Sequence, residues 1–344
     1  MTRGEIFLPV SREEMIQRGW YYYDFLVVTA DGYIDHPSFG STLIARLLEA
    51  EGYRVAILAQ PDWHSAEAFR AMGKPRYGVL IGGGNLDSMV AHYTVAKRRR
   101  TRDLYSPGGE MGHRPDRPTI VYTNRAREAF PDTPIVIGGL EASLRRFAHY
   151  DYWEDKVRRS ILFDAPADLL VYGMGESATA EIARRLAKKT PVQEITDVAG
   201  TAYIAADESG CRFHKALCPS YEEVCADKEA YARATKIEYD EHDPIRGCAV
   251  LQPCEGRLLV VNPPARPLRR EELAWTLTRG RVLSFLRTGA EGSVLAAVNA
   301  GDRPEPIDLP WPARDWMTGA ALEQGEQTLP PMTGWLLTPR PEGA

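Results

Sequence analysis

Three neighbouring side chains near the N-terminus could transfer protons. Asp35 and His36 are adjacent in a polar loop that comes after an apolar run, and Ser38 lies two residues further on. A histidine beside a carboxylate can exchange protons near neutral pH. The alternative interpretation is an Asx-type turn closed by Pro37, in which these side chains only shape the loop.

Two further segments could bind a ligand. Asn85 and Asp87 come after three glycines, where they would either accept hydrogen bonds from a ligand or cap the next helix. Residues 138–146 (GGLEASLRR) resemble a turn that approaches a phosphate, although they lack the Gly-x-Gly-x-x-Gly pattern of dinucleotide sites. Arg145 could instead pair with an acidic neighbour. The candidate ligand-binding residues are Asp35, His36, Ser38, Asn85, Asp87, Gly138, Gly139, Glu141, Arg145 and Glu176.

The elements that must position these residues alternate between apolar runs and amphipathic stretches. The apolar runs predict strands at 25–29, 53–58, 77–81, 119–122, 134–137 and 168–172, and helical spacing predicts helices at 41–51 and 176–189. Strands that are apolar on both faces and separated by helices favour a doubly wound, mostly parallel, Rossmann-like α/β sheet.

Ligands bind outside the carboxyl ends of the strands in such sheets. Those ends carry loops rich in glycine and small polar residues, at 31–40, 82–87, 138–143 and 173–177. The pattern therefore predicts a ligand crevice at this edge. In the alternative interpretation, each glycine only makes a tight turn between a strand and a helix.

Cysteine usage and charge narrow the setting. All five cysteines lie between 211 and 254, which argues against a disulfide framework and for a reducing cytosol. Cys211, His214 and Cys218 could supply three zinc ligands, but no fourth is evident, so we predict no metal site. A net charge of −5 gives no reason to expect a nucleic-acid partner. No apolar run approaches the ~18 residues of a membrane span, so we expect a cytoplasmic protein.

The pattern also divides the chain. Residues 1–200 are predicted as the Rossmann-like domain, and 201–268 as an appendage with strands at 201–204, 236–239 and 257–261 that ends in a proline-rich linker. Residues 273–340 are predicted as a small antiparallel β-sandwich. Its short strands, separated by Gly/Pro turns, are expected at 281–287, 293–299, 306–309, 315–319 and 328–337.

Eight phrases in order carry a family resemblance. They are 35–40 (DHPSFG), 60–63 (QPDW), 85–90 (NLDSMV), 105–109 (YSPGG) with 114–117 (RPDR), 138–146 (GGLEASLRR), 148–153 (AHYDYW), 155–160 (DKVRRS) and 200–203 (GTAY). Over roughly residues 8–272 the chain closely resembles the N-terminal region of YgiQ-type (UPF0313) radical-SAM proteins. The resemblance implies a fold like that of cobalamin-binding domains, followed by a radical-SAM barrel with a [4Fe–4S] cluster and S-adenosylmethionine.

The cofactor motifs of that family are not matched here. The cluster motif Cys-x3-Cys-x2-Cys has no counterpart among the cysteines, whose gaps are six, six, 22 and five residues. The Asp-x-His-x-x-Gly motif of cobalamin ligation also fails, because Asp35 and His36 are adjacent and Gly40 is four residues from His36. We therefore expect no cofactor in this chain alone.

The C-terminal ~65 residues contain the runs 294–302 (VLAAVNAGD), 307–310 (IDLP), 315–319 (DWMTG) and 329–337 (LPPMTGWLL). With these runs they look like the C-terminal β-sandwich of α-amylase-family glycosidases. The catalytic carboxylates of that family lie on a preceding barrel, for which there is no room here, so glycoside hydrolysis is not predicted. Two partial resemblances joined at a proline segment suggest a fusion, or a reading frame truncated and rejoined.

The sequence supports three functional hypotheses. The first is an accessory domain of a radical-SAM protein, inactive by itself, whose crevice would bind or shield a substrate if another chain supplied the core. The second is a stand-alone module that binds a small molecule. The third is a hybrid carbohydrate-related protein, which rests on the tail alone.

Overall fold

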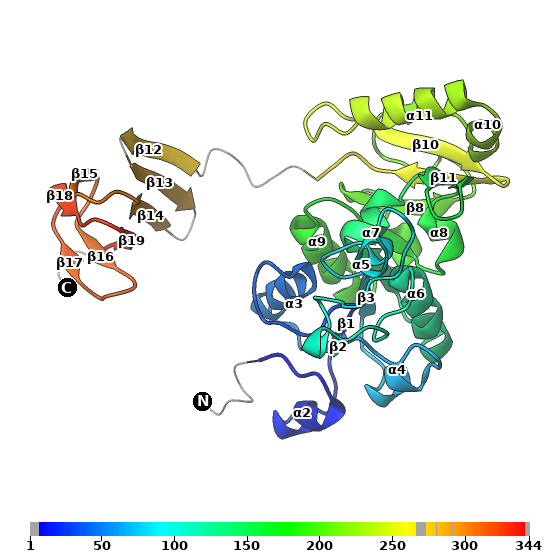
Figure 1. Ribbon diagram of the computed structural model, residues 1–344, viewed down its shortest axis with the longest axis horizontal. Helices are drawn as coiled ribbons and strands as arrows, with labels where there is room; N and C mark the ends of the chain where they lie inside the picture. Colours follow the sequence, from blue (N-terminus) through cyan, green and yellow to red (C-terminus); the bar gives the residue numbers. More distant parts are fainter. Residues whose placement is uncertain (1–6, 266–272, 280, 290–291, 341–344) are drawn as a thin grey trace. The chain divides into compact units, whose positions relative to one another are not determined.

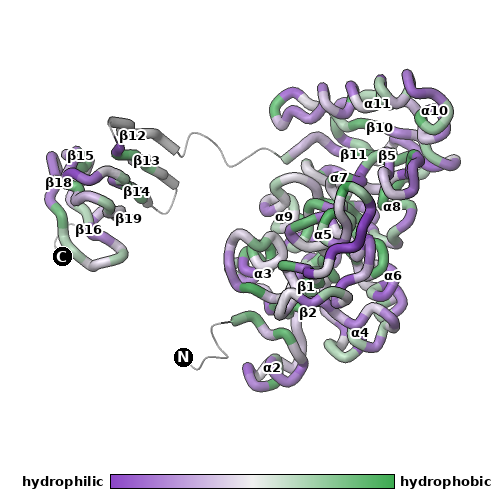
Figure 2. The backbone as a smooth tube through the Cα atoms, in the orientation of Figure 1, coloured by the Kyte–Doolittle hydropathy of each residue, from purple (hydrophilic) through white to green (hydrophobic). Residues whose placement is uncertain are grey.

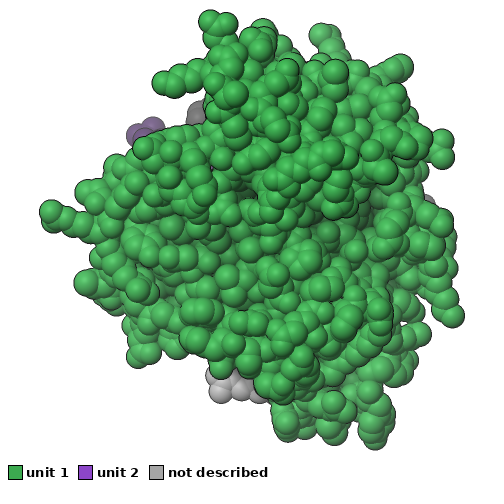
Figure 3. Space-filling view, turned by 90° about the vertical axis from the view of Figure 1, so that its right-hand side faces the viewer, with its two compact units in different colours: residues 1–265 green, residues 266–344 purple. Residues whose placement is uncertain are grey.

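The computed structural model describes residues 7–265, 273–279, 281–289 and 292–340. The chain divides into two compact units, Met1–Ala265 and Arg266–Ala344, which are coloured separately in Figure 3. The division falls within the predicted proline-rich linker. Residues 266–268 of that linker, and residues 1–6 of the first predicted domain, lie outside the described residues.

Nine strands form one sheet in unit 1, in the order β2-β1-β3-β4-β7-β8-β11-β10-β9 (Figure 1). Their bounds are β1 Phe25–Thr29, β2 Val55–Ala59, β3 Gly78–Gly82, β4 Ile135–Gly138, β7 Leu169–Val171, β8 Thr201–Ala205, β9 Lys215–Leu217, β10 Ala249–Cys254 and β11 Arg257–Val261. The first five strands in this order run parallel, whereas β8 pairs antiparallel with both β7 and β11. The sheet is therefore mixed but mostly parallel, and residues 201–261 continue it.

Helices cover both faces of the sheet. They are α2 Arg12–Gln17, α3 Gly40–Ala50, α4 Glu67–Ala71, α5 Ser88–His92, α6 Pro118–Ala129, α7 Gly139–Leu144, α8 Ile161–Asp164, α9 Glu176–Ala187, α10 Tyr221–Ala226 and α11 Lys228–Asp240, with 3-10 helices at Pro107–Gly109 (η1) and Val192–Glu194 (η2). Leu26 and Val28 of β1 pack with α4 and α6, whereas Phe25 and Val27 pack with α3 and α9. This two-sided burial explains why the strands are apolar throughout. No helix in the described part of the chain is both long and apolar enough to cross a bilayer.

The predicted strand at 119–122 is wrong, because these residues belong to α6. Pro118 is the first residue of that helix, a position that suits proline because its fixed φ is already helical and its missing N–H is not needed there. Tyr122 and Ala126, four residues apart, then lie on one buried face. Helical packing overrides the strand preference of the Thr-Ile-Val-Tyr run.

The predicted strand at 236–239 is also wrong and lies in α11. Asp227 caps this helix, since its carboxylate accepts hydrogen bonds from the amides of Glu229 and Ala230 at 3.0 Å each. Ala230 and Ala234 are its buried residues, one turn apart. Figure 2 shows α11 as largely hydrophilic, which is why its narrow apolar stripe was hard to recognise.

Glu238 of α11 lies close to the sheet in a small cavity that it shares with Arg146, Tyr172 and His242. Burial raises the pKa of Glu238 to about 7, while the Arg146 guanidinium opposes the rise. Arg146 in turn lies over the rings of Phe147 and Tyr172, at 5.2 and 4.9 Å from their centroids. The junction between α11 and the sheet therefore holds an acid that titrates near neutral pH.

The end of β11 is fixed by the side chain of Asn262. Its Nδ2 donates to the carbonyl oxygens of Thr196 and Val198 and lies 3.0 Å from the hydroxyl of Thr201. Its backbone N–H donates to the Thr201 carbonyl, and the N–H of Gly200 donates to the carbonyl of Pro263. These bonds close unit 1 after its last strand in sequence.

Unit 2 is built of antiparallel strands, as predicted for the tail. Six of them form a sheet in the order β12-β13-β14-β19-β16-β17, and β15 pairs with β18. Their bounds are β12 Leu273–Arg279, β13 Val282–Gly289, β14 Gly292–Asn299, β15 Glu305–Leu309, β16 Ala313–Asp315, β17 Ala321–Leu322, β18 Gly325–Leu329 and β19 Thr333–Pro339. The predicted strand at 315–319 is wrong beyond Asp315, because that carboxylate accepts from Thr318 Oγ1 and the Met317 amide and closes a turn.

The raised pKa of Glu238 predicts a pH-dependent stability. The folded state holds this proton more tightly than the unfolded chain does, so the wild type loses stability as the pH rises from about 4.3 towards 7. Glu238→Gln does not titrate, and these two pKa values lead us to expect that it gains about 2–3 kcal/mol over the wild type between pH 5 and pH 8. Urea unfolding at both pH values measures this, with exposed Glu229→Gln on the same helix as control. Parallel curves for wild type and Glu238→Gln would contradict the assignment.

Candidate functional site

A cavity of about 260 Å³ lies at the carboxyl ends of β1, β3, β4 and β7, next to the first turns of α3 and α9. Its apolar walls come from Leu43, Ile44, Leu80, Val136, Val171 and Met174, and its backbone walls from Gly40, Gly82, Gly84, Gly138, Gly139, Gly173 and Gly175. The strand order reverses direction between β1 and β3, and ligands of doubly wound sheets bind at that point. This cavity, the carboxyl-edge crevice, is the candidate site.

Four of the predicted residues line the crevice, namely Asn85, Gly138, Gly139 and Glu176. Gly138 ends β4, Gly139 begins α7, and Glu176 begins α9, so the predicted strand-end loops do meet here. The lining does not include the other six predicted residues. The crevice therefore offers mainly backbone groups and apolar surface.

Two glycines after β3 are required by close packing. A Cβ on Gly83 would lie 2.9 Å from both Glu141 Cβ and Thr119 Oγ1. Gly84 has φ +91°, and a Cβ there would overlap the carboxylate of Asp31. A side chain at Gly83 is thus excluded by the buried Glu141, and one at Gly84 by the buried Asp31. The positive φ of Gly84 also favours glycine.

Arg114 is a buried cation beside the crevice that the residue composition did not indicate. It is 1% exposed, and its guanidinium binds Asp103 through Nε at 2.6 Å and Nη2 at 2.8 Å. Its Nη1 donates to Asp31 Oδ1 at 3.0 Å. Asp31 also accepts the backbone N–H of Asn85 at 2.7 Å. One arginine therefore joins the loop after β1, the loop after β3 and the long segment between α5 and α6.

The two acids of this group are not equivalent. Burial raises the pKa of Asp31, against the opposing effects of the Asn85 amide and Arg114. For Asp103 burial acts in the same direction, but the two bonds from Arg114 and those from Tyr105 and Ser106 lower the pKa overall. Asp103 is the carboxylate that Arg114 holds ionised.

Glu141 is fully buried beneath the crevice. Its carboxylate accepts from Ser88 Oγ at 2.8 Å and from the Thr119 amide at 3.0 Å. Burial raises its pKa, and the Arg145 guanidinium opposes the rise. Glu141 thereby ties α7 to the first residues of α5 and α6, which is a positioning contact away from any open surface.

The loop after β1 does not bring Asp35 and His36 together. The Asp35 carboxylate is bound by Arg46 of α3 and accepts the Tyr33 hydroxyl at 3.1 Å, and the Arg46 bonds lower its pKa. His36 and Ser38 are exposed, and Nδ1 of His36 lies 2.7 Å from Ser38 Oγ. The structure therefore shows a His–Ser contact and a separate Asp–Arg pair.

Asn85 and Asp87 have different partners. Asn85 bridges two loops, since its Nδ2 donates to the Ser38 carbonyl at 2.9 Å and its Oδ1 accepts the Gly40 amide at 3.3 Å. Asp87 caps α5 by accepting the Met89 amide and forms an ion pair with Arg145. Helix capping and acidic pairing, both open alternatives from the sequence, are what Asp87 and Arg145 show.

A long segment between α5 and α6 covers this edge. The antiparallel hairpin β5 (His149–Asp151) and β6 (Lys156–Arg158) borders it: Tyr152 donates its hydroxyl to the Val95 carbonyl at 2.8 Å, and Lys97 Nζ donates to the Trp153 carbonyl at 3.2 Å. Such long connections are usually functional or mobile. The segment between α5 and α6 is held in place at the hairpin and at Arg114. In the sequence, only the length of this segment indicated that it could be functional.

The chemistry of the crevice is that of binding. Its glycines allow close approach of a ligand to the backbone, and the first residues of α3 and α9 lie beside it. The nearby carboxylates Asp31, Glu141 and Asp87 are already bonded to side chains or amides of the chain itself.

Comparison with known proteins identifies the family of this chain. Residues 7–282 match the family model described as Radical SAM N-terminal. The chain belongs to the radical-SAM N-terminal family. The matched residues include all nine strands of the sheet and every residue that lines the crevice.

Relatives of this radical-SAM N-terminal region are longer proteins. A UPF0313 protein of Clostridium perfringens (strain 13) is 55% identical over 267 residues, which are 78% of this chain and 40% of the relative. A UPF0313 protein of Clostridium botulinum (strain Loch Maree) is 52% identical over 267 residues, 78% of this chain and 41% of the relative. The chain thus spans about two fifths of the length of these relatives.

The similarity to solved structures is too low to say anything about the fold of this chain. An α-amylase of Anoxybacillus aligns with 92% of this chain and 98% of its own, at 9% identity and a TM-score of 0.25. The amylase-type resemblance of residues 273–340 therefore stays a prediction.

The cluster that this family implies would need cysteine ligands. All five are described and free: Cys211, Cys218 and Cys254 are buried, Cys225 is exposed and Cys248 is half-buried. Among the described residues, no three His, Cys, Asp or Glu side chains come close enough to hold a metal ion. The donor set of this radical-SAM N-terminal chain does not fit a [4Fe–4S] cluster.

The burial of Arg114 predicts a large loss of stability when it is replaced. Arg114→Met leaves two buried carboxylates without their cation, and we expect a loss of about 3–5 kcal/mol in urea unfolding at pH 7. Since Arg114 lowers the pKa of Asp103, the stabilisation is present above the unfolded value of about 3.9 and is lost at more acid pH. The difference from wild type should therefore shrink towards pH 3.

The control for Arg114 is Arg102→Met, which removes an exposed arginine of the same segment. Its unfolding free energy should stay within about 0.5 kcal/mol of wild type. A loss below about 1 kcal/mol for Arg114→Met at pH 7 would show that the buried pair does not hold the loops.

Proposed function

We propose that this chain is a Rossmann-like, cobalamin-binding-domain-like accessory domain of a radical-SAM protein of the UPF0313 type. The observation that carries the proposal is the family match over residues 7–282, in relatives where the shared region is about two fifths of the protein. The order 2-1-3-4-7 of the parallel strands supports the Rossmann-like description, since it is the order of flavodoxin-like doubly wound sheets. Free cysteines agree with a cytoplasmic location.

The proposal includes that this chain does no radical chemistry by itself. Its cysteines lack the spacing Cys-x3-Cys-x2-Cys and do not gather in the described fold. The test is anaerobic reconstitution with iron and sulfide. We expect no chain-bound cluster; ~4 irons per chain with visible absorbance would refute this part of the proposal.

The second part of the proposal is that the carboxyl-edge crevice binds a small molecule. Its walls are backbone and apolar groups, so shape and van der Waals contact would contribute more than charge. Bound ligand must raise the stability of the folded state, which makes a thermal-shift screen of nucleotides, cobalamins and S-adenosylmethionine the direct test.

Two variants of α3 sharpen that screen. Leu43 lines the crevice, so Leu43→Trp fills it, whereas Leu47 on the same helix is outside the lining. A ligand of the crevice should raise the melting temperature of wild type and of Leu47→Trp but lose at least about tenfold in affinity for Leu43→Trp. If no compound shifts the wild type, or if both variants respond alike, the crevice is not the binding site.

The third part of the proposal concerns the partner, a radical-SAM core supplied by another chain. Apolar side chains are strongly exposed in the loops at the carboxyl edge: Val95 is 87%, Leu104 81% and Met174 75% exposed. The proposal takes these three side chains as parts of one docking surface, because a contiguous exposed apolar patch marks an interaction site. In the relatives, the remaining three fifths of the protein are the natural occupant of such a face.

Co-expression tests this docking. The part of the Clostridium perfringens relative beyond the shared region is produced together with this chain, and co-purification is measured. We expect a complex that Leu104→Glu with Met174→Glu abolishes, because buried charges would face an apolar partner. Leu217→Glu with Tyr239→Glu, which changes exposed residues on β9 and α11, should leave it intact. No complex with wild type, or equal effects of both pairs, would exclude docking at this edge.

A further inference from the structure

A second cavity, of about 540 Å³, lies at the opposite end of β7 from the crevice. It opens where β7 and β8 part: the two strands pair only at Leu170 with Ala202 and at Val171 with Thr201. Beyond these pairs the strands diverge, and the space is closed by α8, the residues around η2 and the start of β11. Its volume is within the range of about 300–1,000 Å³ that is typical of small-molecule sites.

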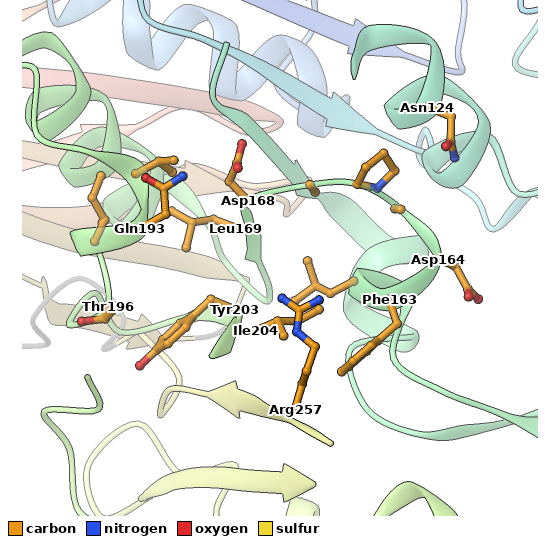
Figure 4. A pocket seen from close by; sticks show the side chains of 16 residues that line it. Asn124, Phe163, Asp164, Asp168, Leu169, Gln193, Thr196, Tyr203, Ile204 and Arg257 are labelled. Atoms are coloured by element: carbon orange, nitrogen blue, oxygen red, sulfur yellow. The ribbon is translucent and has the colours of Figure 1, made fainter. Parts of the chain in front are cut away.

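Large apolar side chains form part of the walls of this cavity. They come from α8, β7, η2 with the residue after it, and β8: Leu162, Phe163, Leu169, Val192, Ile195 and Ile204. Figure 4 labels Phe163, Leu169 and Ile204 among them. They come from both faces of the sheet, since Leu162 belongs to one core and Leu169 to the other. A ligand here would thus contact hydrocarbon on two sides.

The charged side chains that line the cavity differ in whether they form ion pairs. Asp164 is bound by Arg158 at 2.7 Å and by Arg159 at 2.9 Å. Asp168 is bound by Arg127 at 2.8 Å and accepts the Ile135 amide at 2.7 Å. Both lining carboxylates are therefore already neutralised by the chain.

Arg257 differs from them. It has no ion pair within the described part of the chain, and its guanidinium points in among the lining side chains (Figure 4). A guanidinium has five donors in a planar fork that suits a carboxylate, and it stays charged at any physiological pH. An unmatched cation beside apolar walls selects a ligand with an anionic head and an apolar body.

We propose that this cavity is a binding site for a small carboxylic acid with an apolar body, whose carboxylate is held by Arg257. The site is separate from the carboxyl-edge crevice and does not rest on the function proposed for it. It would give the domain a second ligand, on the other end of the same strand.

Isothermal titration with 3-phenylpropionate and octanoate tests the site, with the neutral primary amide of each acid as the matched control ligand. We expect both acids to bind the full chain and to raise its melting temperature, and the amides to bind at least about tenfold more weakly. Inorganic phosphate, which has the charge but no apolar body, should bind more weakly than either acid.

Variants assign the binding to this cavity. Arg257→Gln should weaken acid binding about tenfold or more, and Arg257→Lys should lie between it and wild type because it keeps the charge but loses the fork. Arg246→Gln removes another exposed arginine, outside the cavity, and should bind as wild type does. Since Arg257 is exposed, its variants should fold normally.

Three results would overturn the proposal. They are no binding of either acid at millimolar concentration, equal binding of acids and amides, and undiminished binding to Arg257→Gln. Loss of binding in Leu43→Trp but not in Arg257→Gln would move the acid to the carboxyl-edge crevice, and so would also refute this site while supporting the other.

Discussion

The carboxyl edge of the sheet depends on one buried guanidinium. Arg114 is reached by Asp31 from the loop after β1 and by Asp103 from the segment between α5 and α6, and Asp31 in turn receives the Asn85 amide after β3. Buried charges are strongly unfavourable unless they are paired and fully hydrogen-bonded. This condition restricts how the loops can be arranged, so the shape of the edge is set by electrostatics as well as by hydrophobic packing.

The crevice takes its character from this arrangement. With Asp31 and Glu141 filling the space beneath the loop after β3, Gly83 and Gly84 cannot carry side chains. Backbone and apolar groups then form most of the wall of the crevice, and Asp31 and Glu141 lie outside its lining.

Local patterns predicted the fold well where burial alone decides it. Strands such as 25–29 and 134–137 are apolar because both faces are covered, and this can be read from a few residues. The run at 119–122 is of a similar residue type, but it follows Pro118. It forms part of α6, a helix that packs on the sheet, and is not a strand. Asp87 was predictable as a cap for the same local reason, since its partner is two residues away.

The site was predicted in place but not in detail, because its contacts join distant residues. Arg114 and Asp31 are 83 residues apart, and nothing near either one in the sequence indicates the other. Residues that are adjacent in the sequence need not interact in the fold. Asp35 and His36 are neighbours in the chain, but the carboxylate of Asp35 binds Arg46 of α3. Residue types showed where polar groups gather, whereas their pairing is a property of the folded sheet.

The three hydrogen bonds of the Asn262 side chain hold the last strand of unit 1 to the residues that precede β8 and to its first residue. They lie within 66 residues of sequence and involve only residues of unit 1, so the sheet is completed before residue 266. Codons beyond that point can be exchanged without changing a strand of that sheet. Every partner of the Asn262 side chain thus precedes the division between the two units.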